Sequence, residues 1–353
     1  MILNNTIPET PDGNPGDVAV SGGTPESYPV LEIKNLQTSF RTDEGLIRAV
    51  DNVSFSINRG EAVGVVGESG SGKSVTALSV LRLIQEPPGK ISGGKCIYKG
   101  EDLLKIPASK MREIRGNEIA MIFQDPMTSL NPLMKVGDQI CEAIMLHQKL
   151  NKREAWQAGT EMLRKVRIPL AEERMGDYPF QMSGGMRQRV MIAMALSCNP
   201  SILIADEPTT ALDVTIQAQI LELIKDLQRD TGMAVWMITH DLGVVAETCT
   251  RVIVMYAGQV MEEGTAIQVF HDPKHPYTIG LLSCLPRVDE IRERLEPIAG
   301  QPPNLAALPE GCPFVDRCEV AASDSGKLSR CRSEKPEEIH LDNDRRIRCW
   351  EYI

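Results

Sequence analysis

Met182-Ser-Gly-Gly-Met-Arg-Gln188 is the stretch that decides the fold of this 353-residue chain. A glycine-rich loop, Gly67-Glu-Ser-Gly-Ser-Gly-Lys-Ser74, lies upstream of it, directly after a run of apolar residues. An apolar segment that ends in two acids, Ile202-Leu-Ile-Ala-Asp-Glu-Pro208, follows downstream. A phosphate-binding loop alone occurs in many proteins, but these three motifs in this order are much more specific.

The composition is that of an ordinary globular protein, with 42% hydrophobic and 24% charged residues. The length predicts one large domain with an appendage. A formal charge of −10 argues against a nucleic-acid partner, which needs clustered Lys and Arg. No apolar run is long enough to span a membrane, and the start lacks the features of a signal peptide. Residues 1–29, rich in Pro and Gly, are predicted to form a disordered tail.

Apolar strands that alternate with helical patterns predict an α/β fold with a largely parallel sheet. The insert at residues 136–166 is predicted to be mainly helical, with Gly159 its strongest breaker. Ligands of such sheets bind beyond the carboxyl ends of the strands, where the glycine-rich loop, Asp206 and His240 all lie. The predicted strands cover residues 30–34, 53–57, 62–66, 119–123, 201–205, 234–239, 251–255 and 259–262, and the other predicted helices cover 74–84, 186–196 and 216–228.

The glycine-rich loop has the composition of a triphosphate cradle. Its glycines let the backbone close tightly and point N–H groups inward. Lys73 would reach the β- and γ-phosphates, and the Ser74 hydroxyl would coordinate Mg²⁺. Asp206 would hold the same Mg²⁺, mostly through water. We expect nucleotide contacts from the whole loop: Gly67, Glu68, Ser69, Gly70, Ser71, Gly72, Lys73 and Ser74.

Together these motifs resemble the ATP-binding cassette (ABC) ATPases. The resemblance implies that Glu207 polarises the attacking water and that Gln124, in the glutamine loop of the family, binds Mg²⁺ or water. His240 matches the histidine that contacts the γ-phosphate of ATP. Asp213 matches the loop that crosses to a second cassette, and Phe40 falls where the family places an aromatic ring on adenine.

Ser183, Gly184 and Gly185 open a predicted helix, whose N-terminus suits a phosphate. In the resembled family this phosphate belongs to the ATP of the opposite subunit. The resemblance therefore implies two cassettes that close over two nucleotides and part after hydrolysis.

Further stretches resemble the branch of bacterial importers that contains oligopeptide, dipeptide and nickel permeases, with the oligopeptide ATPase subunits nearest. These stretches are residues 123–132, 184–196, 275–278, 300–304 and 311–318. The resemblance implies an ABC ATPase domain over 30–286, a helical subdomain at about 125–200 and a Cys-rich extension over 287–353. It also implies the partners: a second ATPase subunit, two transmembrane permease subunits and an extracytoplasmic peptide-binding protein. The chain would then be peripheral, on the cytoplasmic side of the inner membrane.

Four of the nine cysteines lie in the last 42 residues: Cys312, Cys318, Cys331 and Cys349. Four thiols suit tetrahedral Zn²⁺ or an iron–sulfur cluster, and they could also be small core residues. Paired Cys-x-x-Cys hooks, common in zinc sites, are absent. The resemblance implies a [4Fe–4S] cluster, with Zn²⁺ as the alternative.

Two other functions remain open beside a transport ATPase. A soluble cassette ATPase acting on chromosomes or ribosomes typically has a long coiled-coil insert or two cassettes, and this sequence has one cassette with a short helical insert. A regulator with a degenerate cassette would not need Lys73, Asp206, Glu207, Ser183 and His240 intact.

Overall fold

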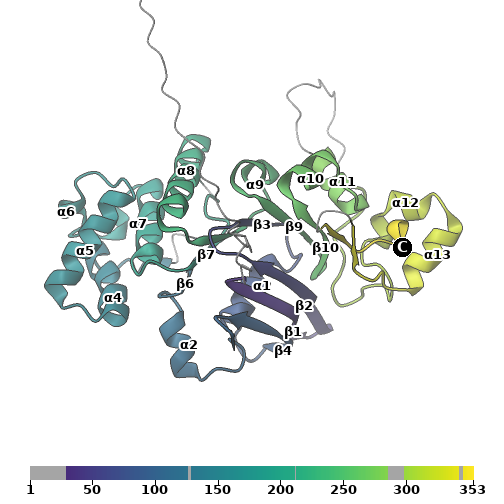
Figure 1. The fold of residues 1–353 in the computed structure, drawn as a ribbon, viewed down its shortest axis with the longest axis horizontal. Helices are drawn as coiled ribbons and strands as arrows, with labels where there is room; N and C mark the ends of the chain where they lie inside the picture. The colour runs from purple at the N-terminus through teal and green to yellow at the C-terminus, as the bar shows by residue number, and fades with distance from the viewer. Residues whose placement is uncertain (1–28, 126–128, 211, 285–297, 342–344) are drawn as a thin grey trace, which may run out of the picture.

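The computed structural model describes residues 29–125, 129–210, 212–284, 298–341 and 345–353, which form two sheets surrounded by helices (Figure 1). The predicted tail at 1–29 lies outside the described residues except for its last residue. The predicted boundary at 286–287 also lies outside them.

The larger sheet is mixed, and its strands follow the order β11-β12-β10-β9-β3-β8-β7-β6. The five strands from β9 to β6 run parallel, whereas β10, β12 and β11 add antiparallel neighbours. All residues of β3, β7 and β8 are buried, which explains their unbroken apolar sequences, because strands covered on both faces have no solvent side. The bounds are β3 Ala62–Val66, β6 Ile119–Ile122, β7 Ile202–Asp206, β8 Ala234–Ile238, β9 Arg251–Tyr256, β10 Gln259–Thr265, β11 Ile339–His340 and β12 Arg346–Ile347.

The smaller sheet is antiparallel, in the order β2-β1-β4-β5, and shares a core with the larger sheet. Phe55 meets Trp236 of β8 edge to face, with ring centroids 5.2 Å apart. Its strands run well beyond the predicted segments at 30–34 and 53–57, because pairing continues through several register shifts. The bounds are β1 Leu31–Thr42, β2 Gly45–Ile57, β4 Gly89–Tyr98 and β5 Glu101–Asp102.

The predicted helical insert consists of two helices. The first ends at Gln148 and is followed by Lys149, whose φ of 56° is left-handed. The second begins at Lys152, after Asn151, whose side chain accepts hydrogen bonds from two backbone N–H groups. Gly159 does not break the second helix. A Cβ there would lie 3.0 Å from the side chain of Ile140, so the glycine allows the two helices to pack closely.

The helices flank the larger sheet, with α4 to α7 gathered at one end of the molecule and α12 and α13 at the other (Figure 1). The predicted helix at 74–84 ends earlier, at Val80. The bounds are α1 Lys73–Val80, α2 Ala108–Ile114, α4 Val136–Gln148, α5 Lys152–Lys165, α6 Ala171–Arg174, α7 Gly184–Leu196, α8 Val214–Thr231, α9 Leu242–Thr248, α10 Ala266–His271, α11 Pro276–Ser283, α12 Glu319–Ala322 and α13 Ser325–Ser333.

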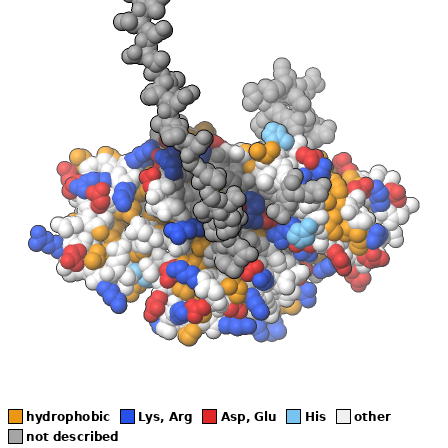
Figure 2. Space-filling view, in the orientation of Figure 1, with side chains coloured by type: hydrophobic (Ala, Val, Ile, Leu, Met, Phe, Trp, Pro, Cys, Tyr) orange, Lys and Arg blue, Asp and Glu red, His pale blue; other side chains and the backbone are white. Residues whose placement is uncertain are grey.

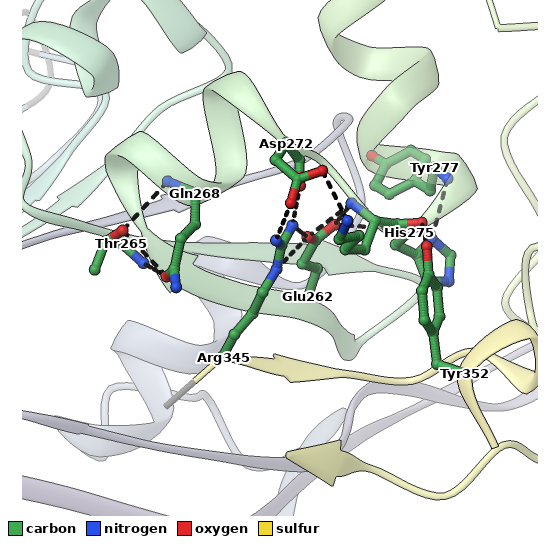
Figure 3. A network of polar contacts seen from close by, with 9 residues as sticks. Glu262, Thr265, Gln268, Asp272, His275, Tyr277, Arg345 and Tyr352 are labelled. Atoms are coloured by element: carbon green, nitrogen blue, oxygen red, sulfur yellow. Dashed lines mark hydrogen bonds and ion pairs between the residues drawn. The ribbon is translucent and has the colours of Figure 1, made fainter. Parts of the chain in front are cut away.

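The C-terminal residues are joined to the larger sheet by a buried ion pair as well as by strand pairing. Arg345 contacts Glu262 of β10, and both side chains are nearly inaccessible to solvent (Figure 3). Glu262 also accepts hydrogen bonds from the backbone N–H groups of Lys274 and His275, at 3.0 and 2.9 Å. Arg345 Nη1 lies 3.3 Å from Asp272 Oδ2. The extension therefore shares a buried polar network with the strand and loop that precede α11.

The surface carries charges of both signs. On the face shown in Figure 2, Lys and Arg side chains are interspersed with Asp and Glu rather than gathered in one stripe. Within the described residues, no helix combines the length and the apolar character that crossing a bilayer requires.

Candidate nucleotide site

The predicted site residues collect at one edge of the larger sheet. β3 runs into the glycine-rich loop, β7 ends at Asp206, and β8 is followed by His240. These strands are parallel neighbours, so their carboxyl ends meet at the same edge. The sequence-based placement of these residues at strand ends is confirmed.

The glycine-rich loop wraps tightly and holds its own lysine. Gly67 and Gly72 have φ of 150° and 99°, and a Cβ on either would lie 2.1 or 2.3 Å from a backbone oxygen. Lys73 Nζ donates to the carbonyl oxygens of Gly67 and Glu68 at 2.8 and 2.9 Å. Burial lowers the pKa of Lys73, and the carboxylates of Glu207, Asp206 and Glu68 oppose that shift. The loop is thus a compact concavity with a cation at its base, as phosphate binding requires.

Ser74 and Asp206 form the pair expected to hold Mg²⁺. Ser74 Oγ donates a 2.9 Å hydrogen bond to Asp206 Oδ1. Burial raises the pKa of Asp206, while the Ser74 hydroxyl opposes the shift. A hydroxyl and one carboxylate beside a phosphate cradle fit Mg²⁺, which keeps several waters and takes its other ligands from the phosphates.

Glu207 is the centre of a hydrogen-bonded group drawn from three segments. Its carboxylate lies 3.0 Å from His240 Nδ1 and accepts hydrogen bonds of 2.9 Å from Gln124 Nε2 and Thr210 Oγ1. Burial favours a higher pKa for Glu207, but the hydrogen bonds from His240 and Thr210 outweigh it, so the pKa is lowered. Glu207 also has a left-handed φ of 47°. Such strained backbone is concentrated at functional sites.

The remaining predicted contacts lie on other elements. Ser183 caps α7, accepting a hydrogen bond from the Met186 N–H, and Asp213 caps α8 in the same way through the Ile216 N–H. Gly185 packs against Ile216, so the starts of α7 and α8 are neighbours. Phe40 lies in β1 opposite Gly89 of β4. Neither Ser183 nor Phe40 joins the hydrogen-bonded group around Glu207.

Thr210 was not predicted as a site residue. Threonine is common in loops that follow strands, so its contact with Glu207 has no signal in a single sequence. Two residues of the C-terminal third, Tyr277 and Arg317, also reach the glycine-rich loop, through Glu68. Both lie in stretches that resemble the peptide-transport branch, which is the signal that could have pointed to them.

The four C-terminal cysteines lie in one region. Cys318, Cys331 and Cys349 line a pocket of about 230 Å³, and the Cys312 N–H donates to the Cys331 carbonyl at 2.7 Å. Burial raises the pKa of Cys312 to about 12 and that of Cys349 to about 11. Among the described residues, however, no group of three or more His, Cys, Asp or Glu side chains is arranged to hold a metal ion. The thiols are chemically suited to a metal centre, but the predicted cluster or Zn²⁺ site is not shown by the described residues.

Two family models match the chain. A model described as "ABC transporter" matches residues 50–210, and one described as "Oligopeptide/dipeptide transporter, C-terminal region" matches residues 261–324.

Among known proteins, the chain is 53% identical to the "Oligopeptide transport ATP-binding protein OppD" of Haemophilus influenzae, over 83% of this chain and 90% of that protein. It is 50% identical to the "Dipeptide transport ATP-binding protein DppD" of Bacillus subtilis, over 91% and 94% respectively. Among solved structures it resembles the ATP-binding cassette MJ0796 in a dimeric post-hydrolysis state bound to ADP and Pi. The TM-score is 0.60 at 29% identity, covering 67% of this chain and 98% of that one.

Proposed function

The chain belongs to the ATP-binding proteins of ABC transporters, in the oligopeptide/dipeptide group, and we propose that it hydrolyses MgATP to drive peptide import across a bacterial inner membrane. Its relatives are named as oligopeptide and dipeptide transport proteins, which supports a peptide cargo. Dipeptides and nickel remain alternative cargos.

The contact of Glu207 with His240 and Gln124 carries the proposal. A carboxylate with a lowered pKa stays ionised at neutral pH and can accept the proton of an attacking water. Next to it, Ser74 and Asp206 would hold Mg²⁺, which would offset negative charge on the phosphates, and Lys73 would neutralise charge on the same phosphates. Gln124 and His240, bound to the same carboxylate, would orient the water and the γ-phosphate.

We further propose that each ATP lies between two ATPase subunits. Ser183, Gly184 and Gly185 open α7, where free N–H groups suit a phosphate, yet Ser183 makes its hydrogen bonds within its own helix. Asp213, at the start of the neighbouring α8, would meet the second subunit, and Phe40 would stack on adenine. The second subunit would be a related ATPase, in a complex with two permease subunits supplied by a peptide-binding protein. This chain would lie on the cytoplasmic side of the membrane.

The test is to purify the transporter from its host through a tag on this chain and reconstitute it in lipid vesicles. We expect ATP hydrolysis that rises when peptide-loaded binding protein is added, together with uptake of labelled peptide. Nickel uptake without peptide uptake would contradict the proposed peptide cargo and support nickel instead. Hydrolysis by a complex that contains no permease subunit would favour the non-transport function.

For the cysteine region we propose a [4Fe–4S] cluster, with Zn²⁺ as the alternative. The support is chemical: the thiols of Cys318, Cys331 and Cys349 line one pocket, and Cys312 is hydrogen-bonded through its backbone to Cys331. Such a cluster would have either a structural or a redox-sensing role. Anaerobic purification followed by iron, sulfide and zinc analysis, on the wild type and Cys312→Ala, tests it. Stoichiometric iron and sulfide that are lost in the variant would support the cluster. Zinc would select the alternative, and absence of both metals would remove the metal proposal while leaving the ATPase untouched.

A further inference from the structure

One residue of the C-terminal extension forms an ion pair with a residue of the phosphate loop. Arg317, in the short 3-10 helix Val315–Arg317, donates through Nη1 and Nη2 to the two carboxylate oxygens of Glu68, at 2.6 and 2.9 Å. Such a two-pronged contact is the strongest geometry available to an Arg–carboxylate pair. The Arg317 side chain is 6% exposed and that of Glu68 25%, so solvent reaches the pair only from the Glu68 side.

Arg317 is itself held in place. Its Nε donates to the Ala299 carbonyl at 3.0 Å, and its Nη1 lies 3.3 Å from the Tyr256 hydroxyl. The guanidinium also lies near the rings of Tyr256 and Phe314, 5.8 and 6.0 Å from their centroids. Gly300, with φ of 80°, passes close enough that a Cβ there would lie 3.2 Å from Arg317 Cγ. Because these contacts hold Arg317 in one position, Arg317 can hold the carboxylate of Glu68 in one position.

The backbone of Glu68 is held from the same side. The Glu68 N–H donates a 2.8 Å hydrogen bond to the Tyr277 hydroxyl. Tyr277 packs against Tyr256 and Phe314, with ring centroids 4.6 and 5.3 Å away. Both the backbone and the carboxylate of Glu68 are therefore bound by residues of the segment 261–324, which matches the oligopeptide/dipeptide transporter C-terminal region.

The Glu68 carboxylate lies where its negative charge would affect phosphate binding. Glu68 follows the first glycine of the loop, and its carbonyl accepts a hydrogen bond from Lys73 Nζ. Its carboxylate is close enough to act electrostatically on Lys73. A free carboxylate at this point would repel the polyphosphate that Lys73 attracts.

We propose that Arg317 is a positioning residue for ATP: it neutralises the Glu68 carboxylate and holds it on the extension side of the phosphate loop. The inference rests on the proposed function, because it takes ATP as the ligand of that loop. Since Arg317 lies between Cys312 and Cys318, the affinity for ATP depends on this cysteine-bearing loop being folded.

The test measures ATP binding by the full-length chain, and ATP hydrolysis by the assembled transporter, in four variants: Arg317→Gln, Glu68→Gln, the double variant, and Arg332→Gln. Arg332 is the matched control, because it pairs with Asp316 in the same extension at 3.2 Å but both side chains are exposed. We expect Arg317→Gln to raise the Kd and KM for ATP about tenfold, the scale of one uncompensated charge near a protein surface. The kcat should change much less, since Arg317 does not contact Glu207. Removing the charge of Glu68 as well should restore the affinity, and Arg332→Gln should bind ATP like the wild type.

A purely structural role for Arg317 gives a different result. It predicts the same loss of affinity whether or not residue 68 is charged, and that outcome overturns the proposal, as does an unchanged Kd in Arg317→Gln. If Arg317→Gln fails to fold, Glu68→Gln alone decides: the proposal requires it to bind ATP at least as tightly as the wild type, and weaker binding overturns it. A wild-type chain that does not bind ATP would contradict the proposed function instead.

Discussion

Glu207 has the contacts of a residue that acts on water rather than on metal. Its carboxylate is bound by His240, Gln124 and Thr210, whereas Asp206 beside it is bound by Ser74, the expected Mg²⁺ ligand. The two adjacent acids also differ in pKa: burial raises that of Asp206, and hydrogen bonds lower that of Glu207. The environments of the two neighbouring acids therefore differ in the way that their two proposed roles require.

Glu207→Gln should therefore stop hydrolysis without stopping ATP binding. An amide cannot take a proton from water, so we expect the rate of a single turnover to fall by about 10²–10⁴-fold, the usual contribution of a general base. ATP should stay trapped in a closed dimer, detectable by gel filtration with labelled nucleotide. Glu222→Gln, which removes an exposed acid on α8, is the control. Turnover near the wild-type rate in Glu207→Gln would remove Glu207 from the mechanism.

Residues of the site that follow buried strands could be predicted from the sequence. The loop at Gly67, the acid pair at Asp206 and His240 each come directly after an apolar run, and parallel strands bring such positions to one edge. Thr210 and Arg317 could not be predicted from such a pattern. Their roles depend on which side chains the fold places opposite Glu207 and Glu68, and local sequence does not encode that.

At the scale of elements, buried strands were easier to predict than helix ends. Strands β3, β7 and β8 match their predicted segments closely because they are buried on both faces. The division of the helical insert was missed, although Asn151 followed by Glu154 forms a capping box that marks a helix start. The pairing of β12 with β10 joins residues far apart in sequence, and two-residue segments carry no periodic signal.

Two capped helices allow the role of the α7 N-terminus to be tested. Ser183→Ala and Asn151→Ala each remove a side chain that accepts a backbone hydrogen bond, and each should cost about 1 kcal/mol of stability. Only Ser183→Ala should lower ATP hydrolysis, because only α7 is proposed to face a phosphate of the second subunit. Thermal unfolding and ATPase rates of the assembled transporter check both. If Ser183→Ala and Asn151→Ala lower the ATPase rate equally, Ser183 only stabilises α7, and the proposed phosphate contact is contradicted.

The start of α11 should make stability depend on pH. His275 is buried, and its Nδ1 accepts a 3.0 Å hydrogen bond from the Tyr277 N–H. Burial lowers the pKa of His275 from 6.5 to about 3. A proton therefore binds the unfolded chain more tightly, so this stability is complete above pH 6.5 and is lost progressively as the pH falls toward 3.

Urea unfolding at several pH values measures this effect. Between pH 6.5 and 5 we expect His275 to account for a loss of about 2 kcal/mol. His275→Asn keeps an acceptor for the helix cap but does not titrate, so the difference between the two proteins isolates the histidine. If the wild type and His275→Asn lose stability in parallel over this range, His275 is not the group responsible.

At the scale of the whole molecule, the C-terminal extension is built into the ATPase rather than attached to its surface. β12 extends the larger sheet, Arg345 reaches the buried Glu262, and Arg317 reaches the phosphate loop. The sequence predicted an appendage and a Cys-rich extension over 287–353, and it could not predict these connections, because contacts with distant residues leave no trace in a local pattern. The physical consequence is that unfolding of the extension would expose charges inside the ATPase domain.

Arg345→Met tests that consequence. The change leaves the fully buried carboxylate of Glu262 without its cation, and removing one partner of such a pair costs about 3–5 kcal/mol. The backbone N–H groups of Lys274 and His275 still bind Glu262, so the protein should fold but unfold at lower urea. The double variant Glu262→Gln, Arg345→Met removes both charges but keeps an oxygen that can accept from the two N–H groups, so it should recover much of the loss.

The control for this test is Lys327→Met, which breaks a 2.8 Å pair with Glu351 in the same extension. Both of its side chains are well exposed, so the change should cost at most about 1 kcal/mol. Urea unfolding is followed by tryptophan fluorescence in a Trp156→Phe background that keeps either Trp236, in β8, or Trp350, in the extension, so that each region is reported separately. If Glu262 joins the extension to the ATPase domain, both fluorescence signals should change in a single transition. Arg345→Met should then lower the urea midpoint of both signals equally. If only the Trp350 signal shifts and Trp236 keeps its wild-type midpoint, the extension is energetically separate and the buried pair does not join it to the ATPase.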